Sequence, residues 1–169
     1  MNKAARKPIT ILIADDDADD CEMIREALEE SRLANDLRFV GDGEELMRYL
    51  RREGNFADPK DSPEPGLILL DLNMPKKDGR EALKEIKQDT KFRSVPVVVL
   101  TTSKAEEDIF RTYDLGVNSY VTKPVTFESL VVILRDIGRY WFEIVELPRA
   151  SISRQANKSR IWSSLPDPE

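Results

Sequence analysis

Four short apolar segments of the sequence each end in a polar residue. They span residues 11–16 (ILIADD), 67–71 (LILLD), 97–101 (VVVLT) and 119–123 (SYVTK). Apolar runs of this length are typical of strands that are buried on both faces of a parallel sheet. Ligand sites of open α/β sheets lie at the carboxyl ends of the strands, so we expect carboxylates, a hydroxyl and an ammonium to meet there. The pattern predicts a magnesium and phosphoryl site, because the need for a polar strand end explains one such ending but not four with matching chemistry.

Helical segments alternate with the strands. We expect strands at residues 9–14, 37–40, 67–70, 95–100 and 119–122, and helices at residues 17–33, 44–52, 79–89, 105–115 and from 127 onward. Apolar strands in five such units imply an α/β fold: a doubly wound, five-stranded parallel sheet with five helices on its two faces, joined by right-handed crossovers.

Composition excludes several classes of protein. The chain has 169 residues and 40% hydrophobic content, which suits one domain. Its single cysteine, Cys21, and its lack of histidine argue against zinc clusters, disulfide frameworks and Cys/His nucleophiles. No apolar run approaches 18 residues, and the net charge is -6, so we expect a cytoplasmic protein that binds neither membrane nor nucleic acid.

The predicted domain occupies residues 8–140. Residues 1–7 form an N-terminal tail, and residues 141–148 extend the last helix or form a dimerisation segment. Residues 149–169 are rich in serine and basic residues, so they are a disordered tail or an arm that docks elsewhere. The stretch 54–66 holds three prolines and is interpreted as a surface loop.

Asp71 ends the central strand and is the candidate nucleophile. Asp15 and Asp16 end the first strand beside it, and three adjacent carboxylates require a cation or a proton. Mg²⁺ fits, because it prefers oxygen ligands and is commonly held by one or two carboxylates with a phosphate. We assign Asp16 and Asp71 as direct ligands, the backbone carbonyl of Asn73 as a third, and Asp15 to the outer shell. Asp17 is equally well explained as a helix N-cap.

Lys123 and Thr101 complete the candidate site. Phosphoryl transfer needs alignment and positive charge around the phosphoryl oxygens, which Lys123 and the metal supply, while the Thr101 hydroxyl offers a hydrogen bond. Taken alone, Lys123 is explained as a solvated lysine and Thr101 as an ordinary strand residue. Their place beside the aspartates favours the functional interpretation.

These residues resemble the receiver domain of two-component response regulators over about residues 8 to 140. The motifs are Asp15-Asp16, Asp71 with Asn73-Met74-Pro75, Asp78-Gly79, Thr101 and Lys123-Pro124. The resemblance implies a flavodoxin-like sheet of strand order 2-1-3-4-5 and an Asp71 that takes a phosphoryl group from a sensor histidine kinase. It also implies a switch rather than an enzyme, with at most slow self-catalysed phosphotransfer and autodephosphorylation.

Three further roles follow from the resemblance. Thr101 and Tyr120 resemble the family's switch pair, in which the hydroxyl moves toward the phosphate and the ring follows inward. Tyr120 is alternatively explained by packing against the last helix. Asn73 and Ser103 occupy positions that tune dephosphorylation in the family.

Departures from the general pattern indicate a subfamily. The long loop at residues 55–65, the strand end at 99–103 and the continuation at 139–148 resemble the stand-alone regulators that partner bacterial phytochromes. Related single-domain regulators of other sensor kinases share this pattern. We expect a sensor histidine kinase as partner, with a bacterial phytochrome favoured.

An apolar stripe continues past the predicted domain and predicts a homodimer. Its residues are Leu130, Leu134, Ile137, Trp141, Ile144 and Val145. The alternative is that residues 141–147 fold back onto their own domain.

Three other functions are alternatives. An aspartyl phosphatase of the haloacid dehalogenase type is disfavoured, because it needs a second acid where this chain has Asn73. A scaffold module that has lost phosphorylation would show substitutions among the site residues, and none is found. A regulator with an intact site could also serve as the intermediate of a phosphorelay.

Overall fold

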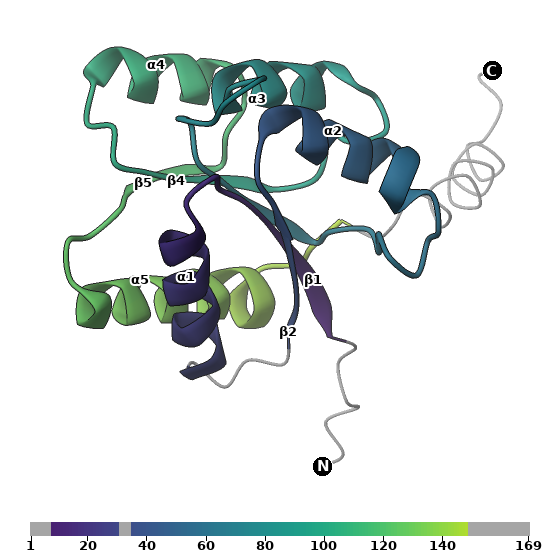
Figure 1. The fold of residues 1–169 in the computed structure, drawn as a ribbon. Coiled ribbons are helices and arrows are strands. Elements are labelled where there is room, and N and C mark those ends of the chain that lie inside the picture. Colours follow the sequence, from purple (N-terminus) through teal and green to yellow (C-terminus); the bar gives the residue numbers. More distant parts are fainter. Residues whose placement is uncertain (1–7, 31–34, 149–169) are drawn as a thin grey trace, which may run out of the picture.

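The computed structural model describes residues 8–30 and 35–148, so the predicted tails at 1–7 and 149–169 lie outside the described residues. Five strands form one sheet of order β2-β1-β3-β4-β5 in which every neighbouring pair is parallel (Figure 1). The strands are β1 (Ile9–Ala14), β2 (Asn35–Val40), β3 (Leu67–Leu70), β4 (Val97–Thr101) and β5 (Ser119–Thr122). The helices are α1 (Ala18–Glu30), α2 (Gly43–Arg51), α3 (Gly79–Gln88), α4 (Glu106–Asp114) and α5 (Phe127–Arg139). The predicted fold class and strand order are confirmed.

Helices cover both faces of the sheet. α1 and α5 lie side by side on one face, and α2, α3 and α4 lie on the other (Figure 1). Alternate residues along a strand point to opposite faces. In β1, Ile11 and Ile13 therefore join the α1 and α5 core, whereas Leu12 and Ala14 join the core under α2 and α3. Two apolar cores thus hold the central strands rigidly beneath the edge where the polar residues lie.

Local hydrogen bonds explain where the helices start. Asp17 accepts hydrogen bonds from the backbone N–H groups of Asp19 (2.9 Å) and Asp20 (3.1 Å), so it caps α1, as its alternative interpretation predicted. Asp78 caps α3 and Thr126 caps α5 in the same manner. Each predicted helix or strand is found, with ends that differ by a few residues, but the predicted end of the first helix at residues 31–33 lies outside the described residues.

The loop between α2 and β3 is tied to the domain. It contains a short 3₁₀ turn, η1 (Gly54–Phe56). The Tyr49 hydroxyl donates to the Pro63 carbonyl at 2.8 Å, and the Ser62 hydroxyl donates to the Phe56 carbonyl at 2.8 Å. Most of its residues are exposed, as expected for a surface loop, but Ser62 is buried.

The segment after α5 packs partly on its own domain, so fewer residues are available for the predicted dimer interface. α5 continues into a π-helical turn, η2 (Tyr140–Ile144), whose Phe142 is buried, and both Trp141 and Leu147 pack against the α1 and α5 core. Leu134 is fully buried in that same core, so it cannot lie in a dimer interface as predicted. The stripe predicted from sequence is therefore covered in part by the domain itself, because the turn brings its aromatic residues back toward the sheet.

Other members of the stripe remain accessible. Ile144 is 68% exposed, while Ile137, Trp141 and Val145 are partly buried. No helix among residues 8–30 and 35–148 is both long and apolar enough to cross a membrane.

Candidate functional site

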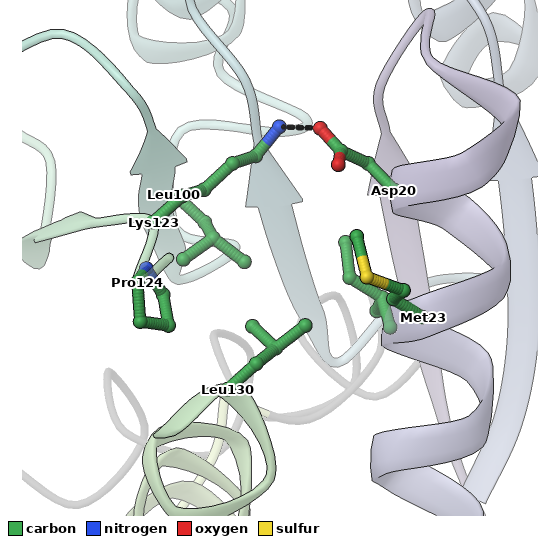
Figure 2. A pocket seen from close by; sticks show the side chains of 7 residues that line it. Asp20, Met23, Leu100, Lys123, Pro124 and Leu130 are labelled. Carbon is green, nitrogen blue, oxygen red and sulfur yellow. Dashed lines mark hydrogen bonds and ion pairs between the residues drawn. The ribbon is translucent and has the colours of Figure 1, made fainter. Parts of the chain in front are cut away.

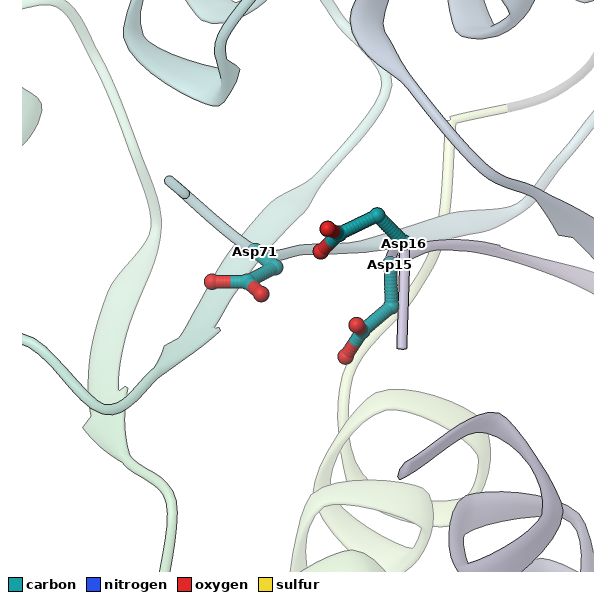
Figure 3. Close-up of side chains that lie close together, drawn as sticks. All are labelled: Asp15, Asp16 and Asp71. Atoms are coloured by element: carbon teal, nitrogen blue, oxygen red, sulfur yellow. The ribbon is translucent and has the colours of Figure 1, made fainter. Parts of the chain in front are cut away.

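Three aspartates meet at the carboxyl edge of the sheet. Asp15 and Asp16 follow β1, and Asp71 follows β3, which pairs with β1 in the sheet (Figure 3). One carboxylate oxygen of each lies within 4.8 Å of the others. The Asp71 backbone N–H donates to the Ala14 carbonyl at 2.9 Å, which fixes the two strand ends against each other. The structure thus brings Asp71 together with the adjacent Asp15 and Asp16, although Asp16 lies 55 residues before Asp71 in the sequence.

The burial of these carboxylates favours a bound cation. Asp15 is 3% exposed and Asp71 is 7% exposed, whereas Asp16 is open to solvent. Desolvation raises the pKa of Asp15, and a hydrogen bond from Lys123 opposes that rise. A divalent ion that keeps several of its water molecules fits a site with three carboxylate oxygens, one of them on the exposed Asp16. The three aspartates are therefore suitable ligands for Mg²⁺ or Mn²⁺.

The Lys123 ammonium lies within the site and contacts three carboxylates. Its Nζ lies 2.6 Å from Asp15 Oδ2, 2.7 Å from Asp20 Oδ2 and 3.3 Å from Asp71 Oδ2. Burial works against the charged form, but hydrogen bonds to Asp15 and Asp20 outweigh it and raise the pKa of Lys123. The lysine is therefore a fixed cation beside the candidate nucleophile and not an ordinary solvated lysine.

Sequence reasoning missed Asp20. It lies in the first turn of α1 and is separated from Lys123 by 103 residues. The sequence does place Asp20 in a helix that starts at the carboxyl edge of the sheet, which could have suggested a role at the site. However, aspartates at the start of a helix are also explained by capping and by the helix dipole.

The loop after Asp71 is held close to α3. The Asn73 backbone N–H donates to Asp71 Oδ1 at 3.2 Å, and the Gly79 N–H donates to the Leu72 carbonyl at 2.9 Å. A Cβ atom on Gly79 would lie 2.2 Å from the Asp71 carbonyl oxygen. Only glycine allows this approach, so Gly79 sets how the loop leaves the carboxylate at its mouth.

Thr101, Ser103 and Tyr120 are connected at the end of β4. Thr101 is fully buried, and its Oγ1 accepts a hydrogen bond from the Ser103 N–H at 3.4 Å. The Tyr120 hydroxyl donates to the Ser103 carbonyl at 2.8 Å. Tyr120 packs against the core under α2 and α3, so its alternative explanation, packing against the last helix, is wrong. The predicted switch pair is thus linked through the backbone of one residue.

A second set of hydrogen bonds connects Ser103, just after β4, to Arg80 in α3. The Ser103 hydroxyl donates to Asp108 Oδ2 at 2.7 Å, and Asp108 also receives two hydrogen bonds of 2.6 Å from Arg80. These hydrogen bonds, the strongest from Arg80, lower the pKa of Asp108 to about 2. Sequence reasoning missed this pair, because residues 28 apart on two helices show no joint pattern in the sequence.

Fold and site together define a class of protein: a flavodoxin-like α/β domain with a cluster of acidic side chains at the carboxyl edge of its sheet. The family model of the response regulator receiver domain matches residues 11–135. The chain belongs to this family, as its motifs predicted.

Two relatives, Rcp1 and RcpA, are similar to most of this chain. Response regulator Rcp1 of Synechocystis sp. (strain ATCC 27184 / PCC 6803 / Kazusa) is 41% identical over 150 residues, which cover 89% of this chain and 100% of Rcp1. The crystal structure of the phosphorylated cyanobacterial phytochrome response regulator RcpA is 45% identical, with a TM-score of 0.79 over 84% of this chain and 99% of RcpA. The Mn²⁺-bound form of Rcp1 is 42% identical, with a TM-score of 0.77 over 84% of this chain and 100% of that one. The chain is thus a receiver-domain response regulator related to phytochrome response regulators.

Proposed function

We propose that this protein is a phosphorylation switch whose Asp71 accepts a phosphoryl group from a histidine of a sensor kinase. The observation that carries the proposal is the position of Asp71: its carboxylate lies in the three-aspartate cluster and 3.3 Å from the Lys123 ammonium. The chain contains no histidine, so a phosphohistidine donor belongs to another molecule.

The reaction is a displacement at phosphorus. One carboxylate oxygen of Asp71 attacks the phosphorus atom, the P–N bond to the donor imidazole breaks, and the ring nitrogen keeps the electron pair. The product is an acyl phosphate on Asp71 and an imidazole. Lys123 stabilises the charge on the phosphoryl oxygens, and Thr101 donates its hydroxyl hydrogen to one of them.

We propose that the metal ion is Mg²⁺. Asp16 and Asp71 would hold it directly, with the Asn73 backbone carbonyl, and Asp15 would act through a water molecule. The ion supplies positive charge that neutralises the carboxylates and the phosphoryl oxygens. The relative Rcp1 has a Mn²⁺-bound form, which supports the binding of a divalent ion by this protein.

Signalling follows from the link between Thr101 and Tyr120. When the Thr101 hydroxyl turns to the phosphoryl group, it leaves the Ser103 N–H, and the Ser103 carbonyl that holds Tyr120 moves with it. Asn73 and Ser103 border the site and tune the loss of the phosphoryl group. The protein acts as a switch and not as an enzyme, apart from slow self-catalysed transfer and hydrolysis.

We further propose a phytochrome as the kinase partner and a homodimer as the assembly. The similarity to the phytochrome response regulator RcpA supports the first proposal. The accessible part of the C-terminal stripe supports the second: Ile137, Trp141, Ile144 and Val145, with Tyr140 half exposed beside them. Exposed apolar surfaces of this kind mark contacts between proteins.

Mass spectrometry after incubation with a small phosphodonor and Mg²⁺ tests the central proposal. The wild type is expected to gain one phosphoryl group, and Asp71→Asn none, because the amide keeps the size of the side chain but removes the nucleophile. Transfer to the Asn variant would overturn the assignment of Asp71. Absence of any adduct on the wild type, with a known receiver labelled in parallel, would favour the scaffold function.

A further inference from the structure

Lys123 is shared by three carboxylates, and one of them lies outside the acidic cluster. Asp15 and Asp71 belong to the cluster, whereas Asp20 reaches Lys123 from α1. Figure 2 shows the Asp20 carboxylate and the Lys123 ammonium joined across the top of a small pocket, with Met23 and Leu130 below them. Asp20 is therefore an additional ion-pair partner of Lys123, the lysine that takes part in the proposed phosphoryl transfer.

The geometry places Lys123 closer to α1 than to the nucleophile. Its Nζ is 2.7 Å from Asp20 Oδ2 but 3.3 Å from Asp71 Oδ2. An ammonium has three hydrogens to donate, and three carboxylates surround this one. A phosphoryl group on Asp71 adds new anionic acceptors, so Lys123 must weaken one existing contact in order to bind them.

Asp20 is the partner that is most easily released. Asp15 is almost fully buried, and its Oδ1 accepts a hydrogen bond from the Asp17 N–H at 2.9 Å. The Asp20 side chain is 27% exposed, against 2% for Asp15, so water can replace the lysine at Asp20 with less loss of free energy. The contact with Asp20 is therefore the one that competes with a phosphoryl group.

We propose that Asp20 is a positioning residue for the reaction at Asp71: it holds the Lys123 ammonium on the α1 side and so weakens binding of a phosphoryl group. The inference rests on the proposed function of Asp71. It assigns to α1 a part in setting how readily this regulator becomes phosphorylated, through one carboxylate that holds no metal.

Binding of beryllium fluoride, a phosphoryl mimic, to the full chain in the presence of Mg²⁺ tests the proposal, with bound fluoride followed by ¹⁹F NMR. Asp20→Asn removes the charge and keeps the shape of the side chain. We expect the mimic to bind about fivefold more tightly, the gain that corresponds to losing one partly exposed ion pair. Asp20→Ser is a second neutral variant with the same expectation. Structural damage would weaken binding, so tighter binding reports on Lys123 itself.

Asp19→Asn is the matched control, because Asp19 is an exposed acid in the same first turn of α1 and has the same charge. It should bind the mimic as the wild type does, and Asp20→Glu, which restores the carboxylate, should return the affinity to the wild-type value. Equal affinities for the Asp19 and Asp20 neutral variants, or weaker binding by the latter, would overturn the role of Asp20. Failure of the wild type to bind the mimic would instead overturn the proposed function of Asp71, and the inference with it.

Discussion

Arg80 and Asp108 form a paired hydrogen-bonded contact between two helices on one face of the sheet. Arg80 Nε lies 2.6 Å from Asp108 Oδ1, and Arg80 Nη2 lies 2.6 Å from Asp108 Oδ2. Arg80 is at the start of α3, close to the loop that carries Asp71, and Asp108 is in the first turn of α4. Because Asp108 also accepts a hydrogen bond from the Ser103 hydroxyl, the pair joins the loop after Asp71 to the candidate switch.

Replacing Asp108 by Asn should lower the free energy of unfolding at neutral pH by about 1 to 2 kcal/mol, because charge-assisted hydrogen bonds are lost. The pKa of Asp108 is about 2 in the folded protein, against an ordinary value of 3.8. A lowered pKa stabilises the fold above the ordinary value, and this contribution is lost as the pH falls toward the folded-state pKa. Urea unfolding between pH 7 and pH 2.5 measures the difference.

Glu107→Gln is the control for that experiment, since Glu107 is an exposed acid in the same turn of α4. It should leave the unfolding curve close to that of the wild type. A difference between wild type and Asp108→Asn that stays constant down to pH 2.5 would show that the carboxylate of Asp108 is not held by Arg80.

Mg²⁺ should stabilise the wild type, and Asp16→Asn should remove this effect. A ligand that binds only the folded state adds about 2.7 kcal/mol at a hundredfold excess over its Kd. Thermal unfolding with increasing Mg²⁺ and then with a chelator measures the shift in Tm. The effect should persist in Asp19→Asn, whose side chain lies outside the cluster. A full Mg²⁺ response in Asp16→Asn would exclude Asp16 as a ligand.

Gly79→Ala should destabilise the protein by about 3 kcal/mol, because a Cβ there overlaps the Asp71 carbonyl oxygen. The Asp71 loop must then shift, so the rate of phosphorylation should fall as well. Gly41→Ala is the control, since its Cβ would meet its nearest atom, Glu45 Oε2, at 3.6 Å. Denaturant unfolding compares the two variants, and equal losses of stability would show that the close approach at Gly79 is relieved without strain.

Ile144→Lys should yield a monomer without unfolding the domain. Ile144 is 68% exposed, so lysine at this position disturbs no core contact of its own domain but places a charge in the proposed interface. Truncation after residue 140 is a poorer test, because it removes Phe142 from the core. Light scattering coupled to gel filtration measures the mass, and Val125→Lys, at a fully exposed valine outside the stripe, is the control. An unchanged dimer in the Ile144 variant would place the interface elsewhere, and a wild-type monomer would remove the dimer proposal.

The fold class and the clustering of Asp15, Asp16, Asp71 and Lys123 could be predicted from the sequence alone. Apolar runs that end in polar residues suffice for this, because parallel strands bring their carboxyl ends to one edge whatever the details of helix packing. The family resemblance added the strand order, which the structure confirms.

The helix side chains that reach that edge could be identified only from the three-dimensional packing. The contacts of Asp20 with Lys123 and of Arg80 with Asp108 depend on how each helix is rotated against the sheet, which no local pattern encodes. The fate of the C-terminal stripe was open for a similar reason. A buried apolar face looks the same in sequence whether its own domain or a second copy covers it, and the turn at residues 140–144 placed Phe142 in the domain's core while leaving Ile144 outside.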